Sequence, residues 1–280
     1  MSRGERSSIG TVTCRFSLST TVDDGVGEGF GKADRPLNLL PDIDFRRTVI
    51  TAELHYQASA QLGMGFSVPY LDLETENNQT GKERHDGGFM DPSLYVVWSP
   101  WELSEEHGDD PFFSLHNLSL LVGLTLPMAD EDPGDAPAVR DAQLGSGSAA
   151  PRVGIGYRGT VTGWLCLFAS FDFTFYVHGD NTDFERGDVY TWRAGASVTP
   201  ASFIAGYVLF EATYTRRSTL EEMTLLESGG TYWFVTPGVV VNPFGRFYLD
   251  ASVAFPVRHH VHEQATLTGI TWTIGTSYQF

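Results

Sequence analysis

The final stretch of the chain, residues 267–280, alternates between two kinds of side chain at every second position. One set is mostly large and apolar, the other mostly small and polar: Thr268, Ile270, Trp272, Ile274, Thr276, Tyr278 and Phe280 against Leu267, Gly269, Thr271, Thr273, Gly275, Ser277 and Gln279. A period of two indicates a β-strand whose faces meet different environments. The rest of the fold must therefore provide an apolar surrounding for one face and a polar surrounding for the other.

This strand ends on an aromatic residue, Phe280, with no polar tail after it. The arrangement resembles the last strand of bacterial outer-membrane barrels. That resemblance implies that Tyr278 and Phe280 belong to the signal read by the barrel assembly machinery. The alternative at this point is a soluble β-sandwich whose last strand ends in Phe.

The same alternation recurs along the chain and predicts about twelve strands. They cover residues 11–20, 47–57, 62–68, 91–98, 114–127, 151–159, 164–177, 190–197, 204–214, 231–241, 246–255 and 267–280. Long acidic connections alternate with short ones, whereas Greek-key connections in a sandwich would not sort in this way. The pattern favours an all-β fold, a closed antiparallel transmembrane β-barrel with short periplasmic turns and long acidic external loops. We expect one domain over residues 1–280, with residues 1–9 as a short tail.

Composition limits the class of protein further. No run of eighteen apolar residues exists in the sequence, so no transmembrane helix is predicted. The net charge of −17 argues against a nucleic-acid partner, which basic patches would bind. The acids cluster where loops are expected, as in residues 72–76 and 130–135. The expected location is the bacterial outer membrane. Residues 1–8 have no apolar signal-peptide core, so we expect either a mature-type chain with an added Met or a start assigned downstream of the true one.

Charged side chains at the polar positions of the strands are candidates for the lining of a lumen. The set contains Arg15, Glu53, His55, Arg152, Arg158, Asp172, Arg193, Glu211, Arg246 and Asp250. Two interpretations compete. The residues either line a narrow aqueous or amphipathic passage, as charged rings do in pores, or form a salt-bridged filling that supports the barrel.

Metal and enzyme sites are weakly indicated. His259, His260 and His262 form the most metal-like stretch, in a region expected to be an external loop. No His-x-Ser pair of the outer-membrane phospholipase type and no GxSxG elbow is present. The prediction is therefore a protein without a cofactor or catalytic site, and an outer-membrane hydrolase is the least favoured function.

Two stretches resemble a particular family. Residues 89–95, Phe-Met-Asp-Pro-Ser-Leu-Tyr, are similar to its "G-D-P-x-L-Y" strand entry. Residues 121–127 and 143–148 are similar to its "G-x-x-L-P-T-G … L-G-x-G-S" stretch, except that Pro127-Met128 replaces Pro-Thr-Gly. The family is the transporter-like outer-membrane group named for the MetA pathway of phenol degradation, which is distantly similar to fatty-acid and aromatic-hydrocarbon channels. The resemblance implies a barrel that passes small, often hydrophobic or aromatic, molecules.

The expected function is therefore an outer-membrane channel for passive passage of small solutes. A structural or interaction barrel with a plugged lumen, acting through its external loops, is the alternative. The expected partners are outer-membrane lipid and lipopolysaccharide, the assembly machinery and a small-molecule solute. The oligomeric state stays open.

Overall fold

The strands of this chain are seen in a computed structural model that describes residues 11–23, 43–59, 61–77, 82–102, 116–129, 148–177, 184–220, 223–224, 229–261 and 269–280. The strands are β1 (Thr11–Asp23), β2 (Ile43–Gln57), β3 (Leu62–Asn77), β4 (Lys82–Phe89), β5 (Ser93–Glu102), β6 (His116–Thr125), β7 (Ala150–Thr162), β8 (Leu165–Thr174), β9 (Phe184–Glu185), β10 (Val189–Ala201), β11 (Ile204–Thr215), β12 (Thr219–Leu220), β13 (Met223–Thr224), β14 (Gly230–Val241), β15 (Phe247–Val261) and β16 (Ile270–Gln279). Within these ranges, no helix is long and apolar enough to cross a membrane.

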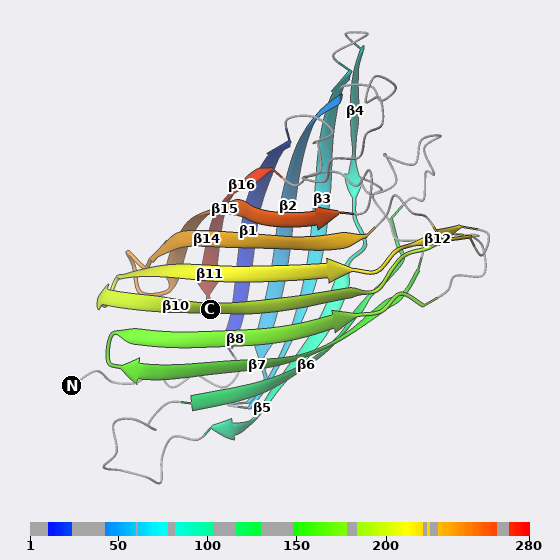
Figure 1. The fold of residues 1–280 in the computed structure, drawn as a ribbon. Helices are drawn as coiled ribbons and strands as arrows, with labels where there is room; N and C mark the ends of the chain where they lie inside the picture. Colours follow the sequence, from blue (N-terminus) through cyan, green and yellow to red (C-terminus); the bar gives the residue numbers. More distant parts are fainter. Residues whose placement is uncertain are drawn as a thin grey trace.

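The long strands close into one antiparallel barrel (Figure 1). A sheet of thirteen strands runs in the order β2-β1-β16-β15-β14-β11-β10-β8-β7-β6-β5-β3-β4, and β2 also pairs with β3. That extra pairing closes a ring of twelve strands and leaves β4 outside it. β1 and β16 join the two ends of the chain through a register that runs from Thr13↔Gln279 to Val22↔Ile270. The predicted closed antiparallel barrel of about twelve strands is confirmed.

The chain departs from prediction between residues 72 and 88, which were expected to be a polar loop. β3 continues to Asn77 and pairs with β4, so this segment extends the sheet beyond the ring. In Figure 1 the β3–β4 hairpin projects beyond the rest of the barrel. The acidic stretch 72–76 therefore lies in a strand. The acidic stretch 130–135 and the tail 1–9 lie outside the described residues, as do most of the long connections.

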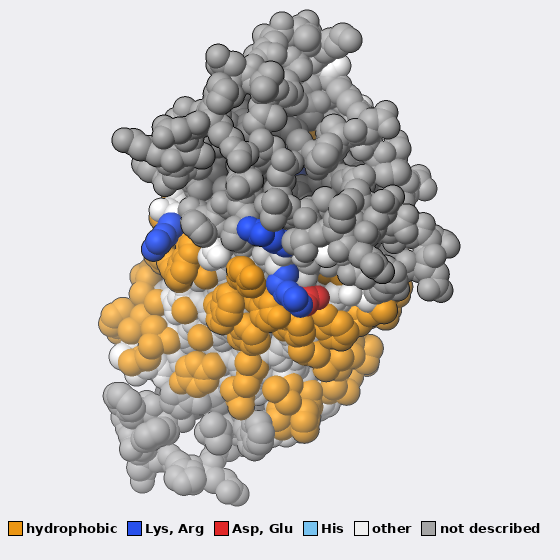
Figure 2. Space-filling model, turned by 45° about the vertical axis from the view of Figure 1, so that its right-hand side comes forward, with side chains coloured by type: hydrophobic (Ala, Val, Ile, Leu, Met, Phe, Trp, Pro, Cys, Tyr) orange, Lys and Arg blue, Asp and Glu red, His pale blue; other side chains and the backbone are white. Residues whose placement is uncertain are grey.

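Large apolar side chains cover much of the barrel wall on the side seen in Figure 2. On β16 the exposed fractions are 42% for Ile270, 58% for Trp272 and 61% for Ile274. The buried apolar residues of the described chain are only Leu71, Leu73, Ala150 and Ala212. A water-soluble protein of this size buries a far larger apolar core, because burial drives its folding. The fold is thus that of a transmembrane barrel, whose apolar band faces lipid.

The opposite face of each strand, here called the inner face, is lined partly by tyrosines that lie over glycines. Atoms of the Tyr95 ring occupy the place of a Cβ at Gly65 on β3, and those of Tyr207 occupy it at Gly238 on β14. Glycine has no Cβ, so it permits this close approach of a ring to the neighbouring backbone. The two rings therefore lie against the wall.

Gly238→Ala is expected to destabilise the barrel by about 1–3 kcal/mol, because the added methyl overlaps the Tyr207 ring. The control is Gly206→Ala on β11, where a Cβ would meet only Val198 Cγ2 at 3.8 Å. Urea unfolding in lipid vesicles measures both changes. Equal midpoints for the two variants would show that the Tyr207 ring does not need the glycine.

Candidate lumen site

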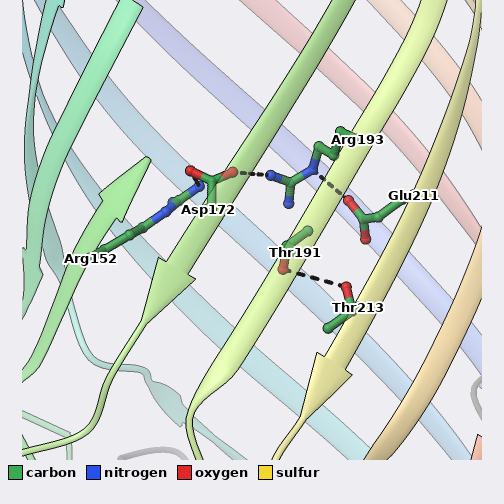
Figure 3. Close-up of polar contacts among 6 residues, drawn as sticks. All are labelled: Arg152, Asp172, Thr191, Arg193, Glu211 and Thr213. Carbon is green, nitrogen blue, oxygen red and sulfur yellow. Dashed lines mark hydrogen bonds and ion pairs between the residues drawn. The ribbon is translucent and has the colours of Figure 1, made fainter. Parts of the chain in front are cut away.

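An ion-pair network joins four neighbouring strands on the inner face (Figure 3). The Asp172 carboxylate on β8 forms ion pairs with Arg152 on β7 at 3.0 Å and with Arg193 on β10 at 2.8 Å. Arg193 Nε donates to Glu211 Oε2 on β11 at 2.5 Å. The four residues meet because Arg193 faces Glu211 in the strand register while Asp172 lies one strand away. Charges therefore alternate in sign around this part of the wall.

A second cluster lies where the chain ends meet. Arg15 on β1 is 3.3 Å from Asp250 on β15 and 4.0 Å from Glu53 on β2. Tyr95 on β5 interacts electrostatically with Glu53, Arg15 and Arg152. In the ring β5 lies between β2 and β7, so Tyr95 stands between the two clusters. The inner wall is charged over much of its circumference.

Three of the predicted lining residues lie apart from these clusters. His55 Nε2 is 3.3 Å from Gln57 Oε1, and its ring stacks on Tyr95 with centroids 6.2 Å apart. Arg158 shares the inner face of β7 with Arg152, and its Nε donates to Cys166 Sγ at 3.4 Å. Arg246 was expected on a strand but lies exposed in the bend before β15, because that strand begins one residue later.

The histidine stretch also differs from expectation. β15 continues to Val261, so His259 and His260 belong to a strand, where they pair with Tyr232 and Thr231, and not to a loop. His262 lies outside the described residues. β15 is longer than predicted because it follows β14 to its far end.

Another group of possible metal-ligating residues was not predicted, because the segment that contains it was expected to be a loop. Side-chain donor atoms of Asp72, Glu74 and His85 lie within 4.8 Å of one another on the β3–β4 hairpin. His85 Nε2 is 3.1 Å from Asp72, and Arg46 is 3.6 Å from Glu74. These contacts form an exposed polar cluster on the hairpin, and exposed acidic groups are common without a metal ion.

Pairs of hydroxyl side chains on neighbouring strands were also not predicted. Alternation in the sequence indicates the face on which a side chain lies, but not its partner on the next strand. Ser19 and Thr273 oxygens are 2.9 Å apart, and Thr21 and Thr271 oxygens are 2.8 Å apart. Both pairs join β1 to β16, the seam where the ring closes. Cross-strand hydroxyl pairs of this kind each add a fraction of a kcal/mol, roughly 0.2–1. They stabilise the closure between the first and last strands.

Beyond the strands, Arg216 follows β11 and donates to Asp188, which precedes β10, at 3.0 Å. This hydrogen bond raises the pKa of the Arg216 guanidinium above its usual value. Arg216 also donates its backbone N–H to the Asp188 carbonyl at 2.8 Å. The two residues tie β10 and β11 together past the end of their ladder.

The comparisons with known proteins agree with this geometry. The family described as "MetA-pathway of phenol degradation" matches residues 42–257. The chain belongs to that family, as the two resembling stretches indicated. No curated protein sequence matches the chain.

Solved structures show the fold. An outer-membrane channel from Pseudomonas putida F1 is similar with a TM-score of 0.78 and 12% identity, and all of both chains is covered. The transport unit of the autotransporter AIDA-I from Escherichia coli gives 0.51 at 12% identity, with 100% of this chain and 93% of that one covered. The NanC porin gives 0.52 at 7% identity, over 94% and 98%. All three share the barrel architecture.

Proposed function

We propose that this protein is an outer-membrane channel through which small solutes pass passively. The observation that carries the proposal is the water-accessible inner wall. Inside a closed ring, the side chains of Arg15, Arg152 and Arg193 remain 47%, 39% and 33% exposed. A filled barrel would bury such groups almost completely, since side chains occupy the interior of small barrels. Twelve strands give a wider interior than the eight that side chains can fill.

Similarity supports the same proposal. The Pseudomonas putida protein with this fold is a channel, and the NanC protein is a porin. Membership of the family and the aromatic side chains of Tyr95, Tyr207 and Phe168 on the inner face favour solutes that include hydrophobic or aromatic molecules. The aromatic pair Tyr278 and Phe280, with centroids 4.8 Å apart at the end of β16, is the proposed contact of the assembly machinery. The apolar band would face lipid and lipopolysaccharide.

Reconstitution into planar bilayers tests the channel directly. The refolded protein is expected to give discrete conductance steps, and vesicles that contain it are expected to swell in small neutral solutes. A heat-unfolded sample from the same preparation is the control. A folded, inserted barrel without conductance or solute flux would contradict the proposal and favour a plugged barrel that acts through its loops.

A further inference from the structure

We propose that the passage prefers small anions, with carboxylates as the solute class, although the chain as a whole is strongly acidic. This inference rests on the proposed channel function. It comes from the depth at which the charged side chains of the inner face lie. Arginine heads face the open interior, and their carboxylate partners lie behind them against the wall.

The layering is visible in the exposed fractions of the paired side chains. Asp172 is 10% exposed, whereas its partners Arg152 and Arg193 are 39% and 33% exposed. In the other cluster Asp250 is 13% exposed and Arg15 is 47% exposed. In these pairs the cation is thus the more accessible member. A solute in the interior meets guanidinium groups before it meets these carboxylates.

Glycines make room for the recessed carboxylates. A Cβ at Gly154 on β7 would lie 2.5 Å from Asp172 Oδ1, and a Cβ at Gly275 on β16 would overlap Asp250 Oδ2. Each carboxylate therefore rests on the bare backbone of the adjacent strand. Any other residue at these positions would push the carboxylate toward the interior, where it would compete with the arginines.

Arg158 adds positive charge that is not balanced in the same way. It is exposed on the inner face near the turn between β7 and β8, and its Nε donates to the Cys166 thiol. Within the described ranges, no carboxylate lies within ion-pair distance of its guanidinium. The ring of Phe168, the Arg158 partner in the β7–β8 register, lies over Gly195 of β10, on the other side of β8. An exposed guanidinium of this kind suits a small organic carboxylate, which it can bind through two parallel hydrogen bonds.

The net charge of −17 does not oppose this preference. Salt screens exposed charges over about 8–10 Å at physiological strength, so acids in external segments act weakly inside the barrel. Charges on the wall of a narrow passage act strongly, because low-dielectric surroundings focus their field on the solute. Rings of arginine or lysine are a known basis of anion preference in pores.

The reversal potential in gradients of KCl and of sodium acetate measures the preference. The native protein is expected to pass chloride and acetate more readily than the accompanying cations. Arg158→Gln is expected to lower the anion-to-cation permeability ratio by about twofold. The matched control is Arg46→Gln, because Arg46 lies on the other face of the sheet with Glu74 and should leave the ratio unchanged.

Arg15→Gln provides a second variant if Arg158→Gln does not fold, and it is expected to shift the ratio in the same direction. A conducting native channel that is cation-selective or unselective would overturn the anion preference while leaving the channel proposal intact. Equal ratios for Arg158→Gln, Arg15→Gln and the native protein would overturn it as well. Absence of any conductance in the native protein would instead contradict the proposed function.

Discussion

Ile274→Arg is expected to destabilise the folded barrel by about 2–4 kcal/mol, because a charge at the middle of the lipid face loses its water. Ile274 lies in the middle of β16 and is 61% exposed on the apolar face. Its neighbours on that face, Trp272 and Ile270, are also exposed. Urea unfolding of the protein in lipid vesicles measures the difference.

The control for this change is Thr273→Arg, one residue away on the inner face. Thr273 pairs with Ser252 and Ser19 across the adjacent strands, where an arginine would reach the water-accessible interior. Its expected cost is limited to the lost Ser19 hydrogen bond, about 1 kcal/mol. If both arginines destabilised the barrel equally, the two faces of β16 would not differ in surroundings, which would contradict the assignment of lipid to one of them.

Asp172→Ala is expected to destabilise the barrel by about 2–4 kcal/mol, because it leaves Arg152 and Arg193 facing each other without their shared carboxylate. Asp172 is 10% exposed, so water screens the loss only in part. The anion-to-cation permeability ratio should rise in the same variant. Urea unfolding in vesicles gives the first quantity and reversal potentials give the second.

The matched carboxylate on the outer face is Glu74, which is 52% exposed and 3.6 Å from Arg46. Glu74→Ala should change stability by less than about 1 kcal/mol, as for other exposed ion pairs. A stability loss at Asp172 as small as that at Glu74 would mean that the inner network contributes little to the fold.

The sequence predicted the faces of the strands because alternation is a local property. In the structure Arg15, Arg152, Asp172, Arg193, Glu211 and Asp250 share the face of the sheet opposite the apolar one. Their partners were not predictable, since pairing depends on the register between strands that are far apart in the chain, such as Arg15 with Asp250. Register is set by the whole ring and not by any one strand.

The misplaced residues have local causes. Residues 72–76 carry three acids, a composition typical of loops, yet tertiary pairing with β2 and β4 holds them in a strand. His259 and His260 continue β15 for the same reason. Propensity alone is a weak guide where a neighbouring strand offers a ladder of hydrogen bonds.

The transmembrane assignment requires hydrocarbon against the outside of the barrel wall. Trp98, Trp192 and Trp272 lie on the apolar face and are 48%, 45% and 58% exposed. Intrinsic tryptophan emission, compared between vesicles of ordinary lipid and of lipid with brominated acyl chains, therefore tests the claim most directly. Strong quenching by the brominated chains is the predicted result. Emission that is the same in both lipids, from a protein that also stays dispersed in buffer without detergent, would contradict it.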